Sequence, residues 1–273
     1  MAKETKSRIA ILGGGNIGCA LARGLVKAGR FTAADVTVTR RQSEKLSSMA
    51  QDGFEVGESN VDAVGGAATI VIAVQPQQLE PLLGEIAPAL DPKRHTIISV
   101  VSGVSVKDIG RSLGARVPVV RAMPNTAVGI GESMTCLSAE DDNGDALQSA
   151  VELFDAVGST LVIPESMMIP ATALCACGVA FFLRTIRAAS QGGIEIGFHP
   201  EDALLLAAQT ARGAAALMLD AGTHPESEID RVTTPRGCTI AGLNEMEHQG
   251  FSSAMIKGIL VSAQKAGTLY GSD

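Results

Sequence analysis

The chain has 273 residues, of which 46% are hydrophobic, and this length allows one large folded domain or two smaller ones. Its formal net charge is −7, which argues against a nucleic-acid or anionic-membrane partner because both require a basic face. The predicted partner is therefore a small molecule, with no nucleic acid and no membrane.

The cysteines and histidines predict neither a disulfide framework nor a metal site. The five cysteines are odd in number and scattered along the chain, and the four histidines stand alone. A zinc site or another metal site needs grouped donors at short spacings. We therefore expect no metal.

The hydrophobic runs favour a cytoplasmic protein. Residues 1–8 carry several charges, and only four apolar residues follow them, which is too few for the core of a signal peptide. The longest apolar run, Ile169 to Leu183, has 15 residues, whereas a membrane span needs about 20. This run is better interpreted as a helix that is buried on all sides.

The first predicted element is a short apolar strand at residues 8–12, and a glycine-rich turn, GGGNIG at 13–18, follows it directly. Apolar residues then return at helical spacing, which gives the strand, turn and helix of a GxGxxG dinucleotide-binding segment. The first glycine permits the tight turn, the second lets the backbone approach a pyrophosphate, and the third lets the helix pack on the strand. The predicted cofactor contacts here are Gly13, Gly15, Asn16, Ile17 and Gly18.

The second predicted strand, at residues 36–39, ends where a site that prefers NAD usually carries an acidic residue for the ribose hydroxyls. Here Thr39, Arg40 and Arg41 occupy that place, and two guanidiniums can bind a 2′-phosphate. We therefore predict NADP as the cofactor, with NAD also possible. The alternative is a pair of solvated arginines that opens the next helix.

Strands and helices continue to alternate up to residue 163. Further strands are predicted at 55–56, 69–74, 96–100, 117–121, 133–137 and 160–163, and helices at 44–51, 60–65, 79–90, 106–113 and 144–157. Such alternation is typical of the α/β class and predicts a doubly wound sheet of the Rossmann type.

Two loops that leave the carboxyl ends of these strands carry further candidates, because such loops line the ligand crevice of an open parallel sheet. The first loop is predicted to lie over the cofactor through Ala73, Val74, Gln75 and Pro76. In the second loop, Asn125 can present its amide between the nicotinamide and the substrate, so it is a candidate for both sites. Its alternative role is structural, since asparagine commonly occupies turns.

Strand signals vanish beyond residue 163. Four helices are predicted at 171–192, 200–222, 238–249 and 252–270, with a possible short fifth at 227–232. We therefore expect a dinucleotide-binding domain over 1–163 and an all-helical domain over 164–273. The first two helices of the second domain are apolar all round, which favours burial in a homodimer. Alternatively, the helices cover one another and the cofactor domain.

The segment 232–247 sets hydroxyls and glycines at the start of a helix. Proline and glycine predict a loop up to residue 239, and apolar residues then return at helical spacing. Free backbone N–H groups, the helix dipole and threonine hydroxyls would suit a small anionic substrate. The alternative is an ordinary capped helix.

Five segments together resemble the pyrroline-5-carboxylate reductase family over nearly the whole chain. They are ILGGGNIG at 11–18, AVQPQQL at 73–79, ISVVSGVSV at 98–106, VVRAMPNTAVGIGE at 119–132 and VTTPRGCTIAGLNEMEHQGF at 232–251. The resemblance implies reduction of a cyclic imine carboxylate with NADPH or NADH, in the last step of proline biosynthesis. It also implies dimers formed through the helical domain, which can assemble into larger rings.

The resemblance also assigns roles within the loop at 233–239. The substrate carboxylate would bind to Thr234, Gly237 and Cys238, with Thr233 in the same loop, and the hydroxyl of Thr239 would point to the ring nitrogen as the catalytic group. The family often has lysine where Gln75 stands and glycine where Arg236 stands. These departures bear on substrate breadth and affinity.

The chemistry expected of the residues agrees with an imine reductase. Oxidation of an alcohol needs a positioned base, and the β-hydroxyacid dehydrogenases, which share the two-domain plan, carry a lysine on the first long helix after the sheet. The helix predicted at 171–192 has no lysine, and the only lysines beyond residue 107 are Lys257 and Lys265. A non-catalytic NADP-binding sensor is the second alternative, and the intact loop at 233–239 argues against it.

Overall fold

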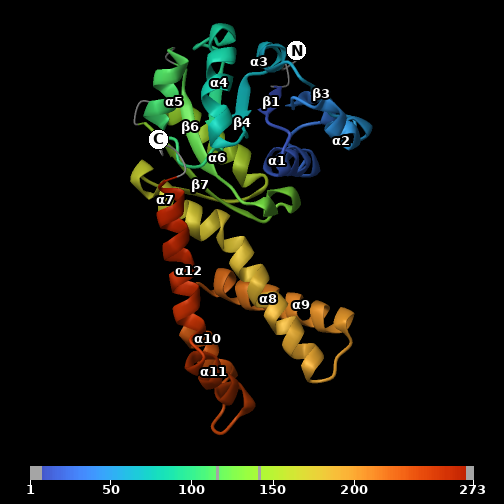
Figure 1. Cartoon of the computed structure of the whole chain (residues 1–273), viewed down its shortest axis with the longest axis vertical. Helices are drawn as coiled ribbons and strands as arrows, with labels where there is room; N and C mark the ends of the chain where they lie inside the picture. Colours follow the sequence, from blue (N-terminus) through green and yellow to red (C-terminus); the bar gives the residue numbers. More distant parts are fainter. Residues whose placement is uncertain (1–7, 115–116, 141–142, 269–273) are drawn as a thin grey trace. The chain divides into compact units, whose positions relative to one another are not determined.

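The structure is a computed structural model that describes residues 8–114, 117–140 and 143–268 (Figure 1). The chain packs into two compact units. The first consists of Met1–Cys177 together with Ser262–Asp273, and the second of Gly178–Val261. By packing, the first unit therefore continues past the domain boundary expected near Ile163.

The first unit is built on one sheet, whose described strands follow the order β3-β2-β1-β4-β5-β6-β7-β8. The strands are β1 (Ile9–Leu12), β2 (Val36–Thr39), β3 (Glu55–Gly57), β4 (Thr69–Ile72), β5 (Thr96–Ser99), β6 (Val119–Met123), β7 (Ser133–Ala139) and β8 (Gly158–Val162). Each predicted strand is present within a few residues of its expected bounds. The order reverses between β1 and β4, so the doubly wound Rossmann-type sheet is confirmed.

One strand departs from the expected parallel arrangement. β7 runs antiparallel to β6, whereas every other described neighbour pair is parallel. The connection between these two strands holds only a short 3₁₀ helix, η4 (Thr126–Ile130). A parallel crossover needs a dozen or more residues, so this short loop can only return the chain antiparallel.

Helices cover both faces of the sheet (Figure 1). The helices are α1 (Asn16–Lys27) and α6 (Gly144–Asp155) on one face and α3 (Asn60–Gly66), α4 (Pro76–Ile86) and α5 (Val106–Leu113) on the other. A short helix, α2 (Ser47–Gln51), follows the 3₁₀ turn η2 (Ser43–Leu46).

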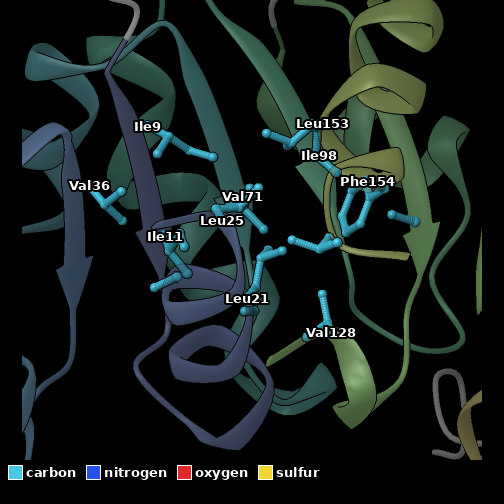
Figure 2. Close-up of a cluster of buried hydrophobic side chains, with 14 of the residues drawn as sticks. Ile9, Ile11, Leu21, Leu25, Val36, Val71, Ile98, Val128, Leu153 and Phe154 are labelled. Carbon is cyan, nitrogen blue, oxygen red and sulfur yellow. The ribbon is translucent and has the colours of Figure 1, made fainter. Parts of the chain in front are cut away.

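The two cores follow from the alternation of side chains along each strand. In β1, Ile9 and Ile11 point to the core under α1 and α6, and Ala10 and Leu12 point to the opposite core; all four are fully buried. Figure 2 shows the first core, where Phe154 of α6 reaches toward the strands. Because β1 is apolar on both faces, it lies in the middle of the sheet.

Every described element beyond β8 is helical. They are α7 (Met168–Ala171), the π-helical turn η7 (Thr172–Ala176), α8 (Gly178–Glu195), α9 (Pro200–Ala221), α10 (Pro225–Val232), α11 (Cys238–His248) and α12 (Phe251–Ala266). The helices expected from the sequence, including the short fifth one, are therefore present. The helix predicted at 171–192 begins earlier and contains the π-helical turn.

The first helical stretch after the sheet is longer than the apolar run in the sequence. Glu165–Glu195 is long and apolar enough to cross a membrane by length and composition alone. An 18-residue window within it has a mean hydropathy of 1.9, and 28% of that window is buried. The expectation of a helix buried on all sides therefore does not hold within the single described chain.

Candidate active site

A cavity of about 740 Å³ opens at the carboxyl ends of β1, β2 and β4. It gathers eight of the predicted cofactor residues, namely Gly13, Gly15, Thr39, Arg40, Arg41, Ala73, Val74 and Gln75. Gly14, Gln42, Asn60, Gln78, Pro81, Leu82 and Glu85 complete the lining. Residues from three separate strand ends thus meet at one site, as the topology of the sheet predicts.

The glycine turn has little room for side chains. Gly13 has a φ of 119°, which is accessible to glycine, and a Cβ there would collide with the carbonyl oxygen of Ala73. A Cβ on Gly18 would collide with the carbonyl oxygen of Gly13, so this glycine lets α1 pack against the turn. A Cβ on Gly15 would meet nothing within 4 Å, which leaves the backbone open on that side.

The amino end of α1 supplies unused donors. The N–H groups of Gly13 and Gly14 donate to the carbonyl of Thr39, at 3.1 and 2.7 Å. Gly15 is the N-cap, and no side chain caps this helix. The first N–H groups of α1, those of Asn16, Ile17 and Gly18, have no partner within the helix and lie at its positive end. Such a terminus favours a negatively charged group such as a phosphate.

The two arginines have different environments. Arg40 is half-buried, and its Nη1 donates to the carbonyl of Gly14 at 2.8 Å, so its side chain lies along the glycine turn. Arg41 is exposed at the edge of the cavity. Among the ion pairs between described residues, neither arginine is neutralised by a carboxylate. Both positive charges therefore remain available to an anionic ligand.

A chain of hydrogen-bonded side chains that was not predicted from the sequence lines the cavity. Thr39 is 1% exposed, and its hydroxyl donates to Oδ1 of Asn60 at 2.6 Å. Asn60 in turn donates to both carboxylate oxygens of Glu85, at 3.2 and 3.1 Å. The hydroxyl hydrogen of Thr39 is thus engaged, and Thr39 can only accept from a ligand. Asn60 could have been predicted from its position just after β3, because the carboxyl end of that strand lies at the same edge of the sheet as the cavity.

Asn125 lies outside the lining of this cavity. It is 8% exposed and caps η4, where its Oδ1 accepts from the N–H of Ala127 at 2.9 Å. Its Nδ2 donates to the carbonyl of Cys175 at 3.4 Å, and its N–H donates to the hydroxyl of Ser133 at 3.1 Å. These bonds give Asn125 the structural role that was its alternative. Contact with substrate or cofactor stays a prediction.

Arg121, in the middle of β6, is a second feature that sequence patterns did not identify. It is 4% exposed, and its Nη1 pairs with Oε1 of Glu165 at 2.7 Å. The same carboxylate oxygen accepts from the N–H of Val106 at 3.3 Å. These bonds, in which only the arginine is buried, tie the start of the helical stretch after β8 to β6 and to the start of α5.

The predicted substrate loop belongs to the second unit. The N–H of Gly237 donates to the carbonyl of Thr234 at 2.9 Å, which closes a turn with Pro235 and Arg236 at its centre. Arg236 has a φ of 63°, and proline followed by a positive φ is typical of a type II turn. A Cβ on Gly237 would collide with the hydroxyl of Thr234, so only glycine fits there.

The helix that follows this turn repeats the arrangement seen at α1. Gly237 is the N-cap of α11, and no side chain caps it. The first N–H groups of the helix, from Cys238 onward, are therefore free for an anion, and Thr239 is half-buried in this first turn. Thr233 differs, because its hydroxyl donates to the carbonyl of Ile229 at 2.7 Å and closes α10.

Two family models match the chain. The model described as pyrroline-5-carboxylate reductase dimerisation matches residues 165–269. The model described as NADP oxidoreductase, coenzyme F420-dependent, matches residues 8–103, which hold the glycine turn and the arginine pair. The predicted NADP-type cofactor and the helical dimerisation domain agree with these matches.

Curated relatives extend the likeness to almost the whole chain. Pyrroline-5-carboxylate reductase 1 of Dictyostelium discoideum is 50% identical over 96% of this chain. This chain spans only 50% of the length of that relative. Pyrroline-5-carboxylate reductase 2 of the same organism is 46% identical over 96% of this chain and 93% of the relative. The chain belongs to the pyrroline-5-carboxylate reductase family. The family expected from the five sequence segments is thereby confirmed.

A solved structure shows the same fold. Plasmodium falciparum pyrroline carboxylate reductase with NADP bound superposes with a TM-score of 0.87, over 96% of this chain and 98% of the other, at 22% identity. This fold and the family match to a dimerisation domain together confirm the prediction of a Rossmann-type sheet followed by a helical dimerisation domain.

Proposed function

We propose that this chain reduces L-1-pyrroline-5-carboxylate to L-proline, with NADPH as the preferred hydride donor and NADH as an alternative. The observation that carries the proposal is the pair of uncapped helix amino ends. One lies at α1 beside two guanidiniums that form no ion pair with a described carboxylate, and the other lies at α11 beside a threonine hydroxyl. The first suits a dinucleotide phosphate, and the second suits a small carboxylate.

The sheet unit would hold the cofactor through two groups of contacts. The N–H groups at the start of α1 would bind the pyrophosphate, because they are the donors that the glycine turn leaves unused. Arg40 and Arg41 would bind the 2′-phosphate, where charge-assisted hydrogen bonds favour NADPH over NADH. Bound NADPH would supply the hydride.

The loop at 233–239 would hold the substrate carboxylate on the N–H groups of α11, and Thr239 would hydrogen-bond the ring nitrogen. An imine nitrogen accepts a proton readily, and its protonation draws electrons from the carbon that receives hydride. A hydroxyl or a water molecule is then a sufficient proton relay. No lysine is needed, in agreement with the absence of lysine from α8.

We further propose the division into a cofactor domain at 1–163 and a substrate and dimerisation domain at 164–273. The dimerisation family match, which begins at residue 165, supports this boundary. Assembly of the dimers into a larger ring and a cytoplasmic location complete the proposal. The five unpaired cysteines of the described chain support a reducing compartment.

The activity is tested by adding pyrroline-5-carboxylate and NADPH to the full chain while the absorbance of the reduced nicotinamide is followed. We expect stoichiometric formation of proline, with a lower KM for NADPH than for NADH. Binding of NADPH without oxidation of either cofactor would instead support the alternative of a non-catalytic NADP-binding sensor.

The role of Thr239 is tested by Thr239→Ala. Loss of one hydrogen bond that forms to the charged ring nitrogen during hydride transfer should lower kcat by roughly tenfold to a hundredfold. The dissociation constant of NADPH, measured by fluorescence titration, should stay within about twofold, since Thr239 touches only substrate. Thr239→Ser restores the hydroxyl and should recover most of the activity. An equal loss of NADPH affinity would show that the assignment is misplaced.

A further inference from the structure

Two cysteine thiols face each other inside the first unit. Cys136 on β7 is 3% exposed, and Cys175 in the π-helical turn η7 is half-buried. Their Sγ atoms lie 3.7 Å apart although the residues are 39 positions apart in sequence. A strand and a helical turn thus bring the pair together, which no local sequence pattern requires.

The two thiols differ in their chemistry. A hydrogen bond joins the two sulfurs, and either thiol could be its donor. This bond lowers the pKa of Cys175 to about 7. The same bond, together with burial, raises the pKa of Cys136 above its usual range. Because the thiolate is the reactive form, the more accessible Cys175 is the attacking group and the buried Cys136 is its resolving partner.

We propose that Cys136 and Cys175 form a reversible dithiol–disulfide site that hydroperoxides oxidise and thiols reduce. The Cys175 thiolate attacks one peroxide oxygen, the O–O bond breaks, and the leaving oxygen takes a proton from water; Cys175 becomes a sulfenic acid. The sulfur of Cys136 then attacks the sulfur of Cys175. The S–S bond forms, and the departing hydroxide leaves as water with the proton of Cys136. Two electrons pass from the dithiol to the peroxide.

The surroundings show which element must move. A disulfide has an S–S distance of about 2.05 Å, so the two sulfurs must come closer. β7 is hydrogen-bonded to strands on both sides, whereas η7 is a single π-helical turn closed by a bond from the N–H of Cys177 to the carbonyl of Thr172 at 3.0 Å. The turn therefore moves toward the strand. The carbonyl of Cys175, which accepts from Asn125, moves with it.

The consequence goes beyond the proposed reductase activity. The disulfide would pin η7 to the sheet immediately before Gly178, where the second unit begins. A π-helical turn is a common site of functional adjustment within a helix. Oxidation would thus fix the π-helical turn that directly precedes α8.

The test uses the full chain, hydrogen peroxide and peptide mass spectrometry after alkylation of free thiols. We expect a peptide pair that joins Cys136 to Cys175, the loss of these two alkylation sites, and their recovery after dithiothreitol. The peptide that contains the exposed Cys238 is analysed separately, as a control for the oxidation of an accessible thiol. If peroxide oxidises Cys238 fully while Cys136 and Cys175 both remain free thiols that can be alkylated, the proposal is overturned.

Three variants separate the roles of the thiols. Cys136→Ser removes the resolving group, so Cys175 should stop as a sulfenic acid that dimedone traps. Cys175→Ser should leave Cys136 unmodified, because that thiol is buried. Cys177→Ser is the matched control, since Cys177 is half-buried close to the pair, and it should still form the disulfide. Dimedone labelling of Cys136 in Cys175→Ser, or no labelling of Cys175 in Cys136→Ser, would contradict the assigned roles.

Discussion

At the residue scale, Arg236 is the described non-glycine residue that has a positive φ. An L-residue in the left-handed region is strained by roughly 1–2 kcal/mol, and glycine is the residue that adopts this conformation freely. The turn closed by Thr234 and Gly237 nevertheless forces residue 236 there. Arginine is unusual at this position, and its positive φ is the physical reason why glycine would suit it.

We therefore predict that Arg236→Gly raises the free energy of unfolding by up to about 1 kcal/mol, after the larger chain entropy of glycine is subtracted. Denaturation in urea measures the change. Arg187→Gly is the matched control, because Arg187 is an exposed arginine inside α8. That variant should lose about 1 kcal/mol. Equal destabilisation by both variants would refute a strained turn at 236.

The second prediction at this scale concerns Arg40, which lies along the glycine turn near the proposed 2′-phosphate. Arg40→Ala removes a charge-assisted bond worth about 1.5–3 kcal/mol, so KM for NADPH should rise tenfold or more. KM for NADH should change far less, because NADH has no 2′-phosphate. Steady-state kinetics with both cofactors checks this prediction.

A comparison of Arg40→Ala with Arg41→Ala shows which arginine contributes more to binding the 2′-phosphate. Arg41 is exposed at the cavity edge, so the loss of Arg41 should raise KM for NADPH less than the loss of the half-buried Arg40. A parallel rise in both cofactors' KM values after Arg40→Ala would mean that the residue only supports the glycine turn through Gly14.

At the element scale, two glycines at the amino end of α1 have different roles, one in packing and the other in cofactor binding. A Cβ on Gly18 would collide with the backbone of the turn, whereas a Cβ on Gly15 would meet open space. Gly18→Ala should therefore destabilise the fold by roughly 1–3 kcal/mol through overpacking. Gly15→Ala should leave the melting temperature nearly unchanged but weaken NADPH binding, because the new methyl group stands where the pyrophosphate would approach. Differential scanning fluorimetry and titration with NADPH measure the two effects. Equal behaviour of the two variants would contradict this division of roles.

Most of the sheet was predictable from short apolar runs, because β1, β4 and β5 are buried on both faces and contain little else. The antiparallel direction of β7 was not, since strand direction depends on the length of the connection after β6. The π-helical turn η7 was also missed, because an extra residue within an apolar helix leaves no change in composition.

The candidate site was predictable only in part, for a similar reason. Position at a strand end identified the glycines and Arg40. The bond partners that fix Thr39, namely Asn60 and Glu85, come from other elements. The pairing of Arg121 with Glu165 likewise depends on packing between distant segments. Single-sequence patterns report the element that carries a side chain, and they do not report which side chain it meets.

At the scale of the whole molecule, the second unit exposes large apolar side chains that a lone chain in water would leave uncovered. Phe182 is 62% exposed, Leu205 is 68% exposed and Leu219 is 84% exposed. The family match to a dimerisation domain explains this surface, and it also explains why the apolar stretch Glu165–Glu195 is so little buried within one chain.

We predict that Leu205→Glu, which places a charge on this apolar surface, converts the dimer to a monomer in analytical ultracentrifugation. If the substrate loop of one chain serves the nicotinamide of the other, turnover should fall at least tenfold in parallel. NADPH affinity should remain, since the cofactor cavity lies within the sheet unit. Leu205→Met keeps an apolar side chain of similar volume and should remain dimeric and active. A monomeric Leu205→Glu variant with full turnover would show that each chain carries a complete active site, and a dimeric one would show that α9 lies outside the interface.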